Sequence, residues 1–422
     1  MKSKSKINLF ILLLLSSIFT QITAQDYSSP HRFVDNYYFR SRDIQVDENI
    51  IYGKAENFRG KTEILDLDLY YPSPAIDPLK KKPLLMLVHG GSTGDNSRTE
   101  KYCPLFAQRG FVVANINRRK GSKGSGETEL LKQAYRAVQD AHAALRHLVH
   151  NAQKYGIDTS AIFVGGVSGG AMATIGITYM RQPDFDSKYP DITSSLGRID
   201  NSTNEINTNF KVRGVVDMWG QIEDTSLISD EEALNIPIII FHSTADSSRS
   251  PYKKALELAA RYKNHGGCYQ LHTSTGTGHT EGISKYYIAQ QSGCFLKSIL
   301  SNSCNSFETE VDNENIKCSN SQAREKLPKQ RLYFELDQSL IKEYAGVYKI
   351  EKEKIVIGSE NGHLFIIESD DGTKTELFPE SQTDFFLEED NIQFSFNKNA
   401  KGKIYGLTLF IDAKAIKAKK IK

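Results

Sequence analysis

Two patterns of hydrophobic and polar positions divide the chain. Between about residues 30 and 302, apolar runs typical of buried strands alternate with longer amphipathic patterns typical of helices. The main predicted strands cover residues 84–88, 111–116, 161–164, 212–216, 238–241 and 268–272. An amphipathic helix is predicted over about 129–155, ended by Gly156. This alternation predicts an α/β domain with a mostly parallel sheet.

A second pattern begins at residue 332, where short alternating segments are separated by turn residues. Seven strands are predicted, over residues 346–350, 354–357, 363–367, 375–378, 384–387, 392–396 and 404–409. Asn361-Gly362 and Asp371-Gly372 are typical hairpin turns. The pattern predicts a small antiparallel barrel or sandwich. The lysine-rich residues 414–420 are interpreted as a frayed, solvated end, with an anionic contact as the alternative.

The first residues have the features of an export signal. Lys2, Lys4 and Lys6 precede an apolar run over 7–18, and small residues around Ala24 predict cleavage there. This apolar run is too short for a membrane span, and the sequence has no second one. The predicted organisation is a signal peptide (1–24), a catalytic α/β domain (25–302), a polar linker (303–331) and a small β domain (332–422). The mature protein is expected to be exported, either to the periplasm or out of the cell.

Charge and cysteine content narrow the function classes. A formal net charge of +2, with both signs mixed along the chain, argues against nucleic acid or an anionic surface as the main partner. Five cysteines leave at least one free or paired between chains. Export permits disulfides, and two pairings are expected. Cys304–Cys318 would close a short polar loop, and Cys268–Cys294 would tie the last strand of the first domain to its last helix.

The strongest chemical motif is Gly166-Val167-Ser168-Gly169-Gly170, which lies between a predicted strand and a predicted helix. A nucleophilic serine must stand on a turn so tight that side chains at the flanking positions would clash. Gly166 and Gly170 remove those side chains. The motif predicts Ser168 as a nucleophile at the carboxyl end of a buried strand.

A serine hydroxyl needs a base and a carboxylate that orients the base. Asp246 follows the strand at 238–241, and His279 follows the strand at 268–272, so both are expected at the same sheet edge as Ser168. The order serine, acid, histidine predicts a Ser168–Asp246–His279 triad. Asp217, which follows the preceding strand, is the alternative acid.

Ester cleavage also needs donors for the oxyanion that forms on the substrate carbonyl. The backbone N–H of Gly169 is the first candidate. Gly91 or Ser92, in the loop after the strand at 84–88, is the second. A polar insertion at 183–209 and the residues around Trp219 are expected to shape the acyl or alcohol pocket.

A metal or another cofactor is not expected. His142, His147 and His150 share one predicted helix, but steps of five and three residues do not place three imidazoles on one face. None of the five cysteines has a histidine and an acid beside it in sequence. His242 and His272 lie within or beside strands and are interpreted as structural.

These residues resemble the α/β-hydrolase superfamily, on its carboxylesterase and lipase side. Besides the glycine-flanked turn at Ser168 and the triad, the matching segments are Leu69-Tyr70-Tyr71-Pro72, His89-Gly90-Gly91, 135–141 and Tyr155-Gly156-Ile157-Asp158. The resemblance covers about residues 60–300 and implies an eight-stranded, mostly parallel sheet and an acyl-enzyme intermediate. Two positions depart from the family pattern, because Ser92 replaces a third glycine and Gly169 replaces a frequent alanine. The last ninety residues are similar to small lipocalin-like β domains appended to exported serine hydrolases.

The sequence therefore predicts an exported serine ester hydrolase that acts on short-chain or polysaccharide-linked esters. A serine peptidase of the same fold is one alternative, and a non-catalytic protein that binds glycan or protein is another. A complete triad in the right order favours the enzyme over the binding protein.

Overall fold

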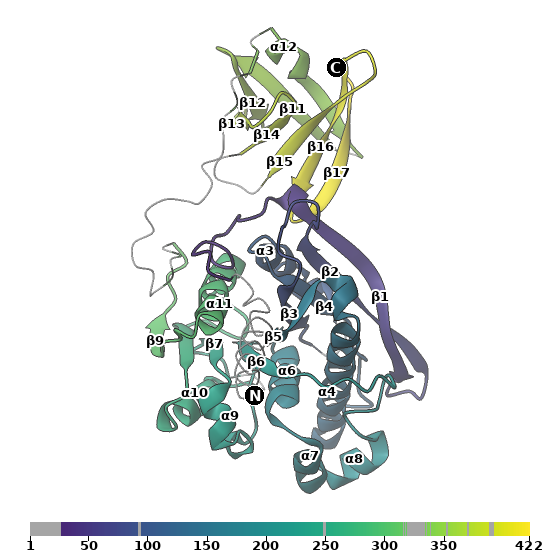
Figure 1. The fold of residues 1–422 in the computed structure, drawn as a ribbon, viewed down its shortest axis with the longest axis vertical. Coiled ribbons are helices and arrows are strands. Elements are labelled where there is room, and N and C mark those ends of the chain that lie inside the picture. Colours follow the sequence, from purple (N-terminus) through teal and green to yellow (C-terminus); the bar gives the residue numbers. More distant parts are fainter. Residues whose placement is uncertain are drawn as a thin grey trace, which may run out of the picture. The chain divides into compact units, whose positions relative to one another are not determined.

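The computed structural model describes residues 27–91, 94–247, 250–314, 316, 318, 334, 336–337, 339–351, 353–368, 371–387 and 392–422. The predicted signal peptide, Ser92 and most of the predicted linker lie outside the described residues. Two architectures follow along the chain, a mixed α/β sheet and then a closed β-barrel (Figure 1). The predicted fold class is confirmed.

The first architecture is a nine-stranded sheet with the order β1-β2-β4-β3-β5-β6-β7-β8-β9. Its strands are β1 (Ile44–Glu56), β2 (Thr62–Pro72), β3 (Lys82–Val88), β4 (Val112–Ile116), β5 (Ile157–Val167), β6 (Val212–Met218), β7 (Ile238–Ser243), β8 (Tyr269–Ser274) and β9 (Phe307–Glu310). β1 and β2 pair antiparallel, β2 pairs antiparallel with β4, and the other neighbours are parallel. Every residue of β3 and β4 is buried, which explains why their sequences are apolar except for Lys82 and Asn115.

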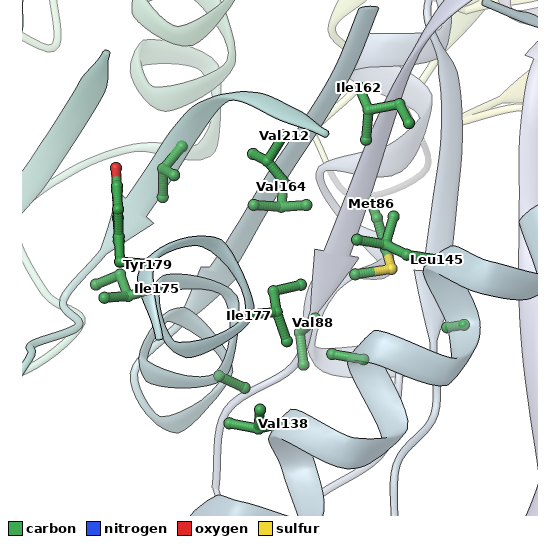
Figure 2. Close-up of a cluster of buried hydrophobic side chains, with 14 of the residues drawn as sticks. Met86, Val88, Val138, Leu145, Ile162, Val164, Ile175, Ile177, Tyr179 and Val212 are labelled. Carbon is green, nitrogen blue, oxygen red and sulfur yellow. The ribbon is translucent and has the colours of Figure 1, made fainter. Parts of the chain in front are cut away.

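Helices cover both faces of this sheet. The larger ones are α4 (Glu127–His150), α6 (Gly169–Tyr179), α10 (Tyr252–Asn264) and α11 (Lys285–Leu300), and the shorter ones are α2 (Ser97–Glu100), α3 (Cys103–Ala107), α5 (Ala152–Tyr155), α7 (Gln182–Lys188), α8 (Pro190–Leu196) and α9 (Asp230–Asn235). Alternation along β5 separates the two faces, because Ile162 and Val164 pack with α4 and α6 (Figure 2). Phe163 points to the opposite face, where a side chain on Gly214 would meet both Phe163 and Ile299 of α11.

The sheet has one strand more than the resemblance implies. β9 lies within the segment predicted to be a linker, and it pairs with β8 through Gln270 and Phe307. This pairing also corrects the predicted disulfides. Cys268 and Cys304 come just before β8 and β9, so the parallel pairing brings them together as one disulfide. The second disulfide joins Cys294 of α11 to Cys318, and Cys103 is free and buried.

The second architecture is a closed barrel of eight antiparallel strands. It follows the short helix α12 (Ile341–Tyr344) and contains β10 (Gly346–Ile350), β11 (Glu353–Glu360), β12 (His363–Ile367), β13 (Lys374–Pro379), β14 (Asp384–Phe386), β15 (Gln393–Lys398), β16 (Ile404–Ile411) and β17 (Lys414–Lys420). Aromatic side chains fill its interior, among them Tyr344, Tyr348, Phe385 and Phe396. The first seven strands match those predicted from alternation.

The interpretation of residues 414–420 as a frayed end is wrong. They form β17, which pairs with β16 along its length and with β10 at Tyr348 and Lys349, and so closes the barrel. Within β17, Ala418 is buried and the other residues are exposed or partly exposed. Because its one buried side chain is an alanine, the strand carries almost no hydrophobic signal.

Candidate active site

Ser168 stands on a strained turn between β5 and α6. Its backbone has φ 54° and ψ −122°, a conformation that few non-glycine residues adopt. A Cβ on Gly166 would overlap the backbone of Gly170, and a Cβ on Gly170 would overlap the carbonyl oxygens of Val88 and His89. Both glycines are therefore required by close backbone approach, as the motif predicts. The side chain of Ser168 is held at the carboxyl edge of the sheet.

The other two predicted triad residues meet Ser168 at this edge. His279 Nε2 lies 2.9 Å from Ser168 Oγ, and His279 Nδ1 lies 2.6 Å from Asp246 Oδ2. Asp246 comes three residues after β7 and His279 five residues after β8. Asp246 is buried, whereas the His279 side chain is 27% exposed. One continuous path of hydrogen-bond contacts therefore runs from a buried carboxylate to a serine hydroxyl.

A second histidine supports the buried carboxylate. His242 Nε2 lies 2.8 Å from the carbonyl oxygen of Ser250 and 3.3 Å from Asp246 Oδ2. Burial lowers the pKa of His242, which favours the neutral ring. Since the Ser250 carbonyl can only accept, Nε2 carries the proton and its N–H edge also faces Asp246. Sequence reasoning classed His242 as structural and missed this contact.

The loops after β6, β7 and β8 are tied together behind the triad. The indole of Trp219 donates to Ser243 Oγ at 2.7 Å, and Ser243 Oγ donates to the carbonyl of Glu281 at 2.9 Å. Trp219 is buried and has a positive φ of 56°. The network fixes the loop that carries His279, so Trp219 positions that loop.

Asp217, the alternative acid, has a different environment. Its side chain is fully buried at the end of β6, and its Oδ1 accepts the Gly220 N–H at 2.7 Å. Oδ2 has no hydrogen-bond partner among the described residues. Burial raises the pKa of Asp217 to about 7. The structure brings Asp246, and not Asp217, to His279.

Asp217 predicts a pH dependence of stability. Its pKa is raised on folding, so the folded state holds its proton at pH values where the unfolded chain has lost it, and stability falls as pH rises from about 4 to 7. Asp217→Asn mimics the protonated acid. We expect urea unfolding to show the variant more stable than wild type by at least about 1 kcal/mol at pH 8, with a much smaller difference at pH 4. An equal effect at both pH values would contradict this origin.

The loop after β3 lies directly against the serine turn. A Cβ on Gly90 would overlap the Val167 carbonyl and approach the Ser168 side chain. Gly91 has φ 78°, a conformation that favours glycine. Gly169 is the first residue of α6, so its N–H has no acceptor within the helix. Gly169 therefore follows Ser168 directly and the loop that carries Gly91 lies against the serine turn through Gly90, while Ser92 lies outside the described residues.

A buried arginine that the sequence analysis missed holds this loop. Arg118 Nε donates to the His89 carbonyl at 3.2 Å, and Nη2 donates to the Gly91 carbonyl at 2.5 Å. Arg118 forms no ion pair with a carboxylate of the described chain, and burial lowers its pKa. Arg118 follows β4, whose carboxyl end lies beside that of β3. This position in the sequence was the feature from which a contact with the loop after β3 could have been predicted.

Arg118 is expected to position the oxyanion donors. Arg118→Met removes both hydrogen bonds to the loop, and we expect kcat on p-nitrophenyl acetate to fall about 10²-fold while KM changes little, because a misplaced donor costs mainly transition-state stabilisation. Arg118→Lys keeps the charge and should recover part of kcat. Matching thermal unfolding of the two variants controls for folding. A rise in KM at unchanged kcat would contradict the positioning role.

The insertion at 183–209 does not lie where it was expected. It begins with α7 at the end of α6 that is opposite Ser168, and it packs on α4, where Tyr135 and Gln139 donate to the carbonyls of Gly197 and Leu196. Part of it lines a cavity of about 520 Å³ that includes Ile199 and contains none of the triad residues. The expectation that this insertion shapes the substrate pocket is therefore wrong.

Of the three helical histidines, His142 serves packing, whereas His150 is exposed. His142 Nδ1 lies 2.6 Å from Arg146 Nη1, and its ring packs on Phe210. Burial lowers the pKa of His142 to about 4. In the described segments no group of three or more His, Cys, Asp or Glu side chains is arranged to hold a metal ion. Within those same segments, no helix combines the length and apolarity needed to cross a bilayer.

Comparisons with known proteins agree with this architecture. Residues 67–237 match the BD-FAE family, and residues 335–420 match DUF3471, a domain of unknown function. The neuroligin-like protein glit-1 of Caenorhabditis elegans is 29% identical over 161 residues, which cover 38% of this chain and 19% of that protein. The cAMP-regulated D2 protein of Dictyostelium discoideum is 33% identical over 125 residues, which cover 28% of this chain and 23% of that protein. The chain thus spans about a fifth of the length of these curated relatives.

Two solved structures are similar to part of the chain. A truncated form of a carbohydrate esterase from gut microbiota has a TM-score of 0.44 and 20% identity, and the match covers 63% of this chain and 98% of that one. The apo form of Thermogutta terrifontis esterase 2 has a TM-score of 0.41 and 20% identity, covering 58% and 87%. The family matches and the two architectures described above lead to one conclusion. The chain carries an esterase domain of the BD-FAE family, with the α/β-hydrolase fold, followed by a C-terminal DUF3471 domain that forms an eight-stranded β-barrel.

Proposed function

We propose that the protein hydrolyses carboxylic esters through a Ser168–His279–Asp246 triad and an acyl-enzyme intermediate. The observation that carries this proposal is the pair of contacts made by His279, at 2.9 Å to Ser168 Oγ and 2.6 Å to Asp246 Oδ2. The BD-FAE match supports an ester as the substrate. The strained turn at Ser168 supports its role as the nucleophile.

In the proposed mechanism, His279 Nε2 removes the Ser168 proton as Oγ attacks the ester carbonyl. Asp246 accepts from Nδ1–H, which holds the ring in the required tautomer and stabilises its positive charge. The N–H groups of Gly169 and of the loop at Gly91 receive the oxyanion. His279 then protonates the leaving alcohol. Water enters, gives its proton to His279 and releases the acid, which returns Ser168 to its hydroxyl form.

The proposed substrates are short-chain or polysaccharide-linked esters outside the cytoplasm. The carbohydrate-esterase character of the BD-FAE family supports an ester borne on a sugar polymer. Export is supported by the signal-peptide pattern at 1–24 and by two disulfides, Cys268–Cys304 and Cys294–Cys318, which form and persist in oxidising compartments.

The test is turnover of p-nitrophenyl esters from acetate to palmitate, together with labelling by a fluorophosphonate. We expect turnover of the shorter esters, and mass spectrometry should place the label on the peptide that contains Ser168. Turnover of long-chain esters alone would contradict the proposed substrate class. A folded protein that neither turns over any ester nor takes the label would contradict the enzyme proposal and favour a binding protein.

A further inference from the structure

The outer wall of the barrel carries a set of lysines on three neighbouring strands. Lys349 of β10 lies opposite Lys419 of β17 on one side and opposite Lys354 of β11 on the other. Lys417 shares the outer face with Lys419, because Ala418 between them is buried in the barrel. We call Lys349, Lys354, Lys417 and Lys419 the lysine patch. Figure 1 shows β16 and β17 as neighbours in the barrel wall.

The positive charges of the lysine patch are not balanced within the described chain. All four residues are exposed, and none forms an ion pair with a described acid, including Glu353 beside Lys354. Other barrel lysines behave differently, since Lys374 pairs with Glu360. Like charges directly opposite each other destabilise a sheet. The arrangement therefore opposes the stability of the wall that contains it, and a bound anion would relieve that repulsion.

An exposed aromatic side chain adjoins the lysine patch. The pairing of β15 with β16 has an irregularity between Asn397 and Lys398, so that Tyr405 is the extra residue on β16. Ile404 and Leu407 on either side are buried, whereas Tyr405 is 56% exposed. The next residue, Gly406, is the cross-strand partner of Lys419. An aromatic face and several ammonium groups thus share one side of the barrel.

We propose that this surface binds an acidic polysaccharide, a polymer whose sugars carry carboxylates. Neighbouring strands are about 4.8 Å apart, so Lys419, Lys349 and Lys354 present ammonium groups at intervals comparable to one sugar unit. Tyr405 supplies a flat apolar surface for a sugar ring. The choice of a sugar polymer rests on the proposed esterase function, because the barrel would then keep the catalytic domain on the polymer that bears its ester.

The experiment is affinity electrophoresis of the full chain in gels that contain polygalacturonate or a neutral xylan. We expect retardation by polygalacturonate that weakens as salt is added, and none by xylan. Lys349→Gln/Lys419→Gln should weaken binding at least fivefold. The matched control, Lys342→Gln/Lys374→Gln, removes two charges from other positions of the same domain and should change binding less than twofold. Turnover of a soluble p-nitrophenyl ester should be equal in all three proteins.

Three outcomes would overturn the proposal. They are no retardation by polygalacturonate at low salt, an equal loss in both double variants, and binding to duplex DNA or phosphatidylglycerol vesicles without binding to polygalacturonate. The Ser168→Ala variant separates this proposal from the esterase proposal, because it should bind polygalacturonate as wild type does. Binding without esterase activity would contradict the esterase alone, and activity without binding would contradict the barrel surface alone.

Discussion

Ser168→Ala is expected to lower kcat on p-nitrophenyl acetate by on the order of 10⁶-fold, to the background left by the oxyanion donors and substrate binding. The substitution removes the oxygen that attacks the carbonyl and that lies 2.9 Å from His279 Nε2. KM should change little, since the hydroxyl adds little to ground-state binding. The alanine would have to adopt the positive φ of 54° that Ser168 has.

The measurement is steady-state kinetics of the purified variant, with fluorophosphonate labelling as the second readout. Circular dichroism and thermal unfolding control for folding. Turnover within tenfold of wild type would show that Ser168 is not the nucleophile. Loss of turnover with the label still attached elsewhere in the chain would point to a different reactive serine.

Asp246→Asn is expected to lower kcat by about 10⁴-fold, because the amide cannot hold His279 in the tautomer that takes the serine proton. In wild type, Asp246 Oδ2 lies 2.6 Å from His279 Nδ1. The amide group of the variant would offer either a competing donor or a weaker, neutral acceptor. The positive charge that forms on His279 would also lose its buried counter-charge.

Asp217→Asn is the matched control for this prediction. It makes the same chemical change in a buried aspartate at the end of the neighbouring strand β6, and it should leave kcat within about threefold of wild type at pH 7.5. The two variants are compared on the same ester series and by thermal unfolding. If Asp217→Asn caused the large loss and Asp246→Asn did not, the acid would be wrongly assigned.

The features that the sequence predicted well depend on local constraints. Gly166 and Gly170 mark the serine turn because backbone passes within overlap distance of each. The central strands β3 and β4 are visible because both of their faces are buried, so most of their residues are apolar. Asp246 and His279 could be placed because the carboxyl ends of parallel strands meet at one edge.

The features that the sequence did not predict depend on pairing at long range. The disulfide of Cys268 with Cys304 follows from the pairing of β8 with β9, and β9 has too short and polar a sequence to be recognised. The role of Arg118 depends on which loop carbonyls face it. The insertion at 183–209 could not be placed because its position depends on the direction of α6 away from Ser168.

The closure of the barrel by β17 has a consequence for biosynthesis. The contact that completes the barrel joins Tyr348 to Lys420, near the two ends of this domain. During translation β10 emerges first and must wait, with one edge unpaired, until residues 414–420 have been made. An unpaired edge is a site for pairing with other chains. Nascent chains that stall or are cut after β10 and before residues 414–420 would be the aggregation-prone species, whereas the released full-length barrel has no free edge.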